Sequence, residues 1–278
     1  MLCTAAGALS GCGSSAGPDA LPRLTGVHAI AFVSESTQQT ITQRTAQITV
    51  QGSVNTQGVD VALTGSGALN FSTDQSSMTL SENFGSNSAV VTELHVDGKS
   101  FLGLTINGQS LSSLIGKQWV SAPSGKANVT YQLASDPIAK LKALEVKGAK
   151  VVSLASKDVA GIPCRGFAVT ITLAEWMADA EHSSAYHLLS ASQQAQFRQG
   201  LAGGKPPTIQ VWFDASGLVR EMTTSLDIGG TKAASGVVTL DFSHYGAPVN
   251  LTMPSRSTVI PFTRFVQDIK NLSNNAAI

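Results

Sequence analysis

The feature of this sequence that most constrains its fold is an alternation of apolar and uncharged polar residues. Ala46, Ile48 and Val50 alternate with Thr and Gln, and the same period of two returns between residues 59 and 71. Successive side chains of a β-strand point to opposite faces of a sheet. The pattern therefore predicts strands with one buried face and one wet face, which is typical of antiparallel sheets.

This period predicts about ten strands in two runs, with a more helical stretch between them. The first run covers residues 46–54, 59–71, 78–84, 90–96, 100–104 and 116–120, and the second covers 151–154, 167–173, 209–213, 218–228 and 237–242. Asp97-Gly98 predicts a tight hairpin turn, and Asp214 to Gly217 predicts another. Glycines inside a strand, such as Gly65 and Gly67, indicate a bend, a bulge or a close backbone approach.

Helical spacing and helix-start signals predict the helices. Between Thr25 and Ile41 an amphipathic helix is expected, packed through one face. That face comprises Val27, Ile30, Ala31, Ser34 and Ile41. Further helical segments are expected after Asp136-Pro137, at Trp176 to Ala180, from the capping box at Ser190 to Gly203, and after Pro261.

The order of these elements points to a fold class. The alternating βαβ series of a doubly wound parallel sheet is missing from the predicted order. We therefore predict one α+β domain over residues 25–278. It consists of a single strongly curved antiparallel β-sheet, a half-barrel, with helices packed on its concave face.

Composition excludes several classes of partner. Eighteen Lys and Arg balance eighteen Asp and Glu, and only 13% of the residues are charged. An even charge balance leaves no electrostatic footprint for nucleic acid. The later sequence also lacks a run of 18 apolar residues that would span a bilayer. We expect a monomer without a cofactor.

The tetrad Leu9-Ser10-Gly11-Cys12 matches a bacterial lipobox, in which the cysteine is lipidated. It predicts residues 1–11 as the remainder of a signal peptide whose natural start lies upstream, and residues 12–24 as a flexible tether. Palmitate-type acyl chains on Cys12 would hold the protein at the extracytoplasmic face of the cell membrane, because two or more chains anchor firmly. The alternative is a chance tetrad of small residues ahead of a cytoplasmic domain.

Signals for catalysis and metal binding are weak. Residues 13–17 spell G-x-S-x-G, but a nucleophile elbow needs a preceding strand and a following helix, which are not predicted here. His182 and His187 are five residues apart, whereas a helical zinc pair needs a spacing of four. Once Cys3 is removed and Cys12 is acylated, Cys164 is left alone and is expected to be buried. We predict neither an enzyme nor a metal site, although a triad assembled only in three dimensions stays open.

A series of short motifs then runs in a specific order through most of the chain from Thr25 to Pro254. After the lipobox come the helix leading into Arg44, Asp97-Gly98, and the segments 116–120, 211–220 and 242–249. This order resembles the LppX/LprG-type family of actinobacterial envelope lipoproteins, which are related in fold to the lipoprotein carrier LolA. The resemblance implies an apolar cavity for acyl chains of lipids or glycolipids, and it supplies no catalytic set.

A lipid carrier needs an apolar space between sheet and helices, and each CH₂ buried there would contribute about 0.8 kcal/mol. The residues expected to line it are Ile48, Leu63, Gly65, Leu69, Met78, Leu80, Phe167, Val169, Ile171, Trp176, Met222, Leu226, Val238 and Leu240. The predicted function is binding of acyl chains for transport or presentation in the cell envelope. The alternative is a scaffold lipoprotein with a filled interior and a protein partner, docked through the face around Trp212 or the C-terminal helix.

Overall fold

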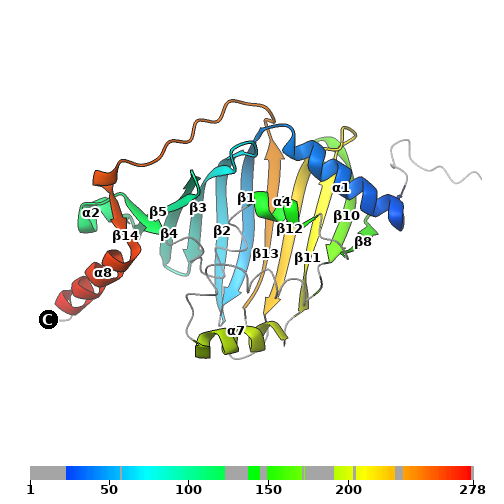
Figure 1. Ribbon diagram of the computed structural model, residues 1–278. Helices are drawn as coiled ribbons and strands as arrows, with labels where there is room; N and C mark the ends of the chain where they lie inside the picture. Colours follow the sequence, from blue (N-terminus) through cyan, green and yellow to red (C-terminus); the bar gives the residue numbers. More distant parts are fainter. Residues whose placement is uncertain are drawn as a thin grey trace, which may run out of the picture.

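The computed structural model describes residues 23–56, 58–122, 137–144, 149–170, 172, 191–202, 205–228 and 234–276. Fourteen strands among these residues form one large, curved sheet (Figure 1). In chain order the strands are β1 (Thr45–Thr56), β2 (Val59–Asn70), β3 (Gln75–Phe84), β4 (Asn87–Val96), β5 (Lys99–Ile106), β6 (Gln109–Ser110), β7 (Trp119–Ala122), β8 (Lys150–Ser153), β9 (Lys157–Val159), β10 (Ile162–Thr170), β11 (Lys205–Phe213), β12 (Val219–Ile228), β13 (Ala234–Ser243) and β14 (Val259–Pro261).

The two predicted runs of strands join into one sheet. Its order is β14-β7-β5-β4-β3-β2-β1-β13-β12-β11-β10-β8, with β6 beside β5 and β9 beside β10. The junction is the antiparallel pair of β1 and β13, which lie nearly at opposite ends of the sequence. Short β14 pairs with β7 in parallel, whereas the other described pairs are antiparallel. The prediction of a curved antiparallel sheet in an α+β fold is confirmed.

The turns follow their predicted chemistry. Asp97 and Gly98 connect β4 to β5 with φ angles of 50° and 68°. Positive φ at both central residues is what a type I′ hairpin turn requires, and Asp-Gly tolerates it. At the β11–β12 turn, the Gly217 amide donates to the Asp214 carbonyl oxygen over 3.0 Å. Both predicted turns are confirmed.

The described helices are α1 (Val27–Ile41), α2 (Leu111–Ile115), α4 (Pro137–Ala143), α7 (Ala191–Ala202) and α8 (Phe262–Ala276), with a short 3₁₀ helix, η1 (Arg256–Thr258). Figure 1 shows α1 crossing the β10–β12 end of the sheet, α7 beyond the ends of the central strands, and α8 next to β14. The helices predicted after Thr25, Pro137, Ser190 and Pro261 are confirmed. The predicted segment at Trp176 lies outside the described residues.

The packing face of α1 differs from the prediction. Val27 and Ile30 are 74% and 49% exposed, and the buried positions are Ala29, Val33, Ser36, Thr37 and Thr40. Small and hydroxyl side chains let the helix lie close to the sheet. The buried Thr40 hydroxyl group has both a hydrogen-bond acceptor and a donor there. It donates to the Ser36 carbonyl oxygen over 2.9 Å and accepts from the Val219 amide over 3.0 Å.

Candidate functional site: the apolar face of the sheet

One face of the sheet carries a continuous cross-strand row of apolar residues. We call the face that bears this row the apolar face. The row runs through directly paired positions from β10 to β5: Phe167, Val211, Met222, Leu240, Val50, Gly65, Leu80, Val91 and Leu104. Strands lie about 4.8 Å apart, so eight spacings make the row about 38 Å wide.

Most of the predicted cavity residues are brought together on this face. Gly65 lies in the row itself. A single buried cluster contains Ile48, Leu63, Leu69, Met78, Leu80, Phe167, Val169, Met222, Val238 and Leu240. Ile171, Trp176 and the side chain of Leu226 lie outside the described residues. That these residues line a ligand cavity stays a prediction.

Helices α1 and α4 pack against part of this face. Phe32 of α1 lies against two rings of the sheet, with centroid separations of 5.3 Å to Phe167 and 5.7 Å to Phe213. From α4, Ile138 and Leu141 join the same buried cluster. Phe32 was not among the residues predicted for the site, although a phenylalanine ring in the predicted helix between Thr25 and Ile41 was a visible signal.

The glycine of the central row permits close contact with its neighbour. A Cβ atom on Gly65 would lie 2.3 Å from the Thr79 carbonyl oxygen and 2.8 Å from Leu80 Cδ2. The predicted close approach at this glycine is confirmed. The space beside its backbone is occupied by the Leu80 side chain.

Toward β3 to β5, the rows on either side of the central row carry ionisable side chains among apolar ones. Glu82 pairs with Leu63 and Ala89, so its carboxyl group shares the apolar face, and burial raises its pKa above the ordinary value. On the other side Glu93 pairs with Met78, and His95 follows two residues later with Nδ1 3.0 Å from Ser100 Oγ. The apolar face therefore has an apolar expanse and one polar end.

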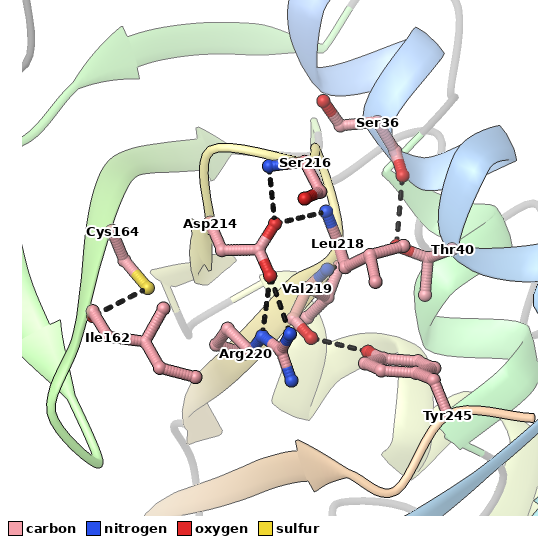
Figure 2. A network of polar contacts seen from close by, with 10 residues as sticks. All are labelled: Ser36, Thr40, Ile162, Cys164, Asp214, Ser216, Leu218, Val219, Arg220 and Tyr245. Atoms are coloured by element: carbon pink, nitrogen blue, oxygen red, sulfur yellow. Dashed lines mark hydrogen bonds and ion pairs between the residues drawn. The ribbon is translucent and has the colours of Figure 1, made fainter. Parts of the chain in front are cut away.

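A second arrangement of polar groups holds the β11–β12 turn (Figure 2). Asp214, only 6% exposed, accepts hydrogen bonds from the Ser216 and Leu218 amides over 2.8 and 3.0 Å. Its other oxygen lies 2.7 Å from both Nε and Nη2 of Arg220. Tyr245 donates to the Val219 carbonyl oxygen, and burial raises the Tyr245 pKa. Because both Asp214 oxygens are paired within the turn, this network stabilises it.

Cys164 stands close to this network and is buried without a disulfide, as predicted (Figure 2). Burial, and secondarily the Asp214 carboxylate, raise its pKa to about 11. A thiol that is protonated at neutral pH is a poor nucleophile. Cys164 is therefore suited to packing.

The described residues contain neither a metal-binding cluster nor a helix that could span a membrane. Among them, His, Cys, Asp and Glu form no group of three or more with metal-binding geometry. None of the described helices is both long enough and apolar enough to cross a membrane. Of the five histidines, His182 and His187 lie outside the described residues.

Comparison with known proteins gives structural neighbours only. No family model matches the sequence, and no curated protein matches it. The fold is similar to that of LprF from Mycobacterium bovis, with 13% identity over 83% of this chain and 98% of that chain, and a TM-score of 0.44. It is also similar to the Mycobacterium tuberculosis lipoprotein LppX, with 11% identity over 82% of this chain and all of that chain, and a TM-score of 0.41. Both are of the LppX/LprG type that the sequence motifs resemble.

Proposed function

We propose that this protein is an extracytoplasmic lipoprotein of the cell envelope, anchored through Cys12, which binds lipid acyl chains for transport or presentation. The chains would lie between the apolar face, taken as the concave side of the sheet, and the helices α1 and α4. The observation that carries this proposal is the unbroken apolar row from Phe167 to Leu104.

The size of the row fits long hydrocarbon chains. The hydrocarbon core of a bilayer is about 30 Å thick, so a chain in one leaflet spans about 15 Å. A row about 38 Å wide is more than twice that length. Apolar contact of this extent binds chains of varied structure, because the hydrophobic effect is non-directional.

The polar end of the face suggests an orientation for the lipid. Glu82, Glu93 and His95 would stand near the polar headgroup, and the acyl chains would extend from there toward β12 and β10. Burying a charged headgroup among Met222 and Leu240 would cost its hydration without a compensating partner. The polar end is therefore the place where burial of a headgroup costs the least hydration free energy.

Native mass spectrometry of the full chain carrying Cys12→Ala tests the proposal, since this variant cannot be acylated at Cys12. We expect a second species with the added mass of a non-covalent lipid, which is released when the protein is denatured. Only the apo mass, after expression in a host that makes long-chain lipids, would contradict lipid binding.

A matched pair of neighbouring valines locates the site. Val238 is buried on the apolar face, and Val237 is 46% exposed on the opposite face of the same strand. Val238→Phe should reduce the lipid-bound fraction, because the added ring extends from the sheet into the layer where the chains would lie. Val237→Phe should leave the lipid-bound fraction unchanged.

The scaffold alternative predicts a different result for the same pair. In a filled interior, Val238→Phe would overpack the core at a cost of about 1–3 kcal/mol. A large fall in Tm without any bound lipid in the parent protein would therefore favour the scaffold function.

A further inference from the structure

A pocket of about 250 Å³ lies over β4, β5 and β7, at the end of the apolar row and mainly on the opposite side of the sheet. Val90, Thr92 and Thr105 line it, and their pairing places them on the side of the sheet opposite Val91 and Leu104. Its volume is below the ~300–1,000 Å³ of pockets for drug-sized ligands. It therefore fits a single ring and not a pair of acyl chains.

Trp119 forms one wall of this pocket and is held rigidly. The indole packs on Leu94, Val96 and Phe101. Its strand, β7, is hydrogen-bonded on both sides, to β5 and in parallel to β14. Gly103 lies opposite the ring: a Cβ atom there would be 3.6 Å from Trp119 Cζ3. Because Gly103 has no side chain, the space beside the indole stays open. A wall that is fixed before the ligand arrives lowers the entropic cost of binding.

The remaining lining is uncharged and mixes apolar with polar side chains: Val90, Leu104 and Leu111 stand beside Thr92, Thr105, Ser110, Ser112 and Gln118. None of the described residues that line the pocket carries a charge. Within the described part of the chain, neither the Gln118 side-chain amide nor the Thr105 hydroxyl makes a hydrogen bond. A charged ligand would find no counter-charge here, and a purely apolar one would leave these polar groups unpaired.

We infer that this pocket binds one neutral sugar ring. The C–H face of a pyranose would stack on the Trp119 indole, and its hydroxyl groups would hydrogen-bond to Gln118 and Thr105. Val90, Thr92, Gly103 and Thr105 belong to the face of the sheet opposite the proposed lipid cavity, and Leu104 is the one lining residue that the pocket shares with the apolar row. Sugar binding can therefore succeed or fail whether or not lipid is found.

Titration of the ¹⁵N-labelled full chain carrying Cys12→Ala tests this inference, with methyl α-D-glucopyranoside and methyl α-D-mannopyranoside as probes. We expect saturable shifts of the Gly103, Thr105 and Trp119 amides, with a Kd of about 1–10 mM for a ligand of this size. Glycerol and inorganic phosphate are the controls for an open polyol and an anion. The absence of saturable shifts with both glycosides, or equal shifts with either control, would overturn the site.

Gly103→Val adds a branched side chain to the pocket beside the indole. The contacts of an added Cβ are ordinary at 3.6–3.7 Å, so Tm should be maintained. We expect at least a tenfold loss of sugar affinity in this variant. Leu102→Val, on the other face of the same strand, should leave the affinity unchanged. Unaltered binding by Gly103→Val would place the sugar elsewhere and overturn the assignment.

The sugar could belong to a soluble polysaccharide or to a glycolipid headgroup. Retention on immobilised glucan and mannan is compared with retention on vesicles that contain a glucosylated or a mannosylated diacylglycerol, using the Cys12→Ala protein with and without Gly103→Val in each arm. Retention in either arm that is lost in Gly103→Val supports the pocket and identifies the source. Retention in neither arm overturns the inference.

Discussion

Removal of the Asp214 carboxylate should be among the most damaging single changes in the described structure. Asp214→Ala deprives the Ser216 and Leu218 amides of their acceptor and leaves the Arg220 guanidinium, whose side chain is 21% exposed, without its partner. Loss of the two amide hydrogen bonds costs about 2 kcal/mol in total. The unpaired, largely buried cation adds about 1–2 kcal/mol, because water reaches part of it. We expect the free energy of unfolding to fall by about 3–4 kcal/mol.

Urea unfolding followed by circular dichroism measures this change in the Cys12→Ala background. Lys142→Ala is the matched control, because its ion pair with Asp74 is exposed, with side chains 55% and 65% accessible. Exposed pairs contribute about 0–1 kcal/mol. Asp214→Asn keeps an acceptor for the two amides and should fall between the two variants. If Asp214→Ala costs no more than Lys142→Ala, then the turn network does not stabilise the fold as reasoned here.

Three further outcomes follow from the contacts. Gly65→Ala should destabilise the fold by about 1–3 kcal/mol, because its Cβ would meet a β3 carbonyl oxygen at 2.3 Å, whereas Gly103→Ala should be nearly neutral; thermal denaturation of the two variants compares them. Burial, and then Glu221, raise the Asp241 pKa, so its ionisation opposes folding once the pH rises above the ordinary Asp range. Asp241→Asn should therefore raise Tm at pH 7 and not at pH 3, and an equal effect at both pH values would refute this. Cys164, with a pKa of about 11, should react with a thiol reagent at pH 8 only upon unfolding; prompt labelling of Cys164 itself in the folded chain, located by peptide mass, would show that it is accessible.

Several elements were predictable because their signals are local. The helix ending at Ile41, the hairpin at Asp97-Gly98 and the Asp214 turn depend on spacing or on the chemistry of one or two residues. The alternation from Ala46 onward also identified which side chains of each strand share a face. These predictions hold in the folded protein because each pattern depends on only a few neighbouring residues.

Other features had no local signal. The parallel pair of β7 and β14 joins residues about 140 positions apart, and three-residue strands such as β14 are too short to show a period. The face through which α1 packs was predicted wrongly, because hydropathy ranked Val27 and Ile30 above Ser36 and Thr40. The close fit to the sheet and the bond from Val219 to Thr40 outweighed hydropathy there.

The sequence by itself determined the longer strands, the turns at Asp97-Gly98 and Asp214, and the apolar side of those strands, since side-chain alternation and turn chemistry depend on covalent geometry alone. Only the tertiary structure decided that β13 lies beside β1, and hence that apolar positions from Phe167 to Leu104 align in one row. It also decided that Trp119 stands over Gly103 at the pocket on β4, β5 and β7. Strand order and register emerge from packing between segments distant in the sequence, and no local pattern encodes those pairings.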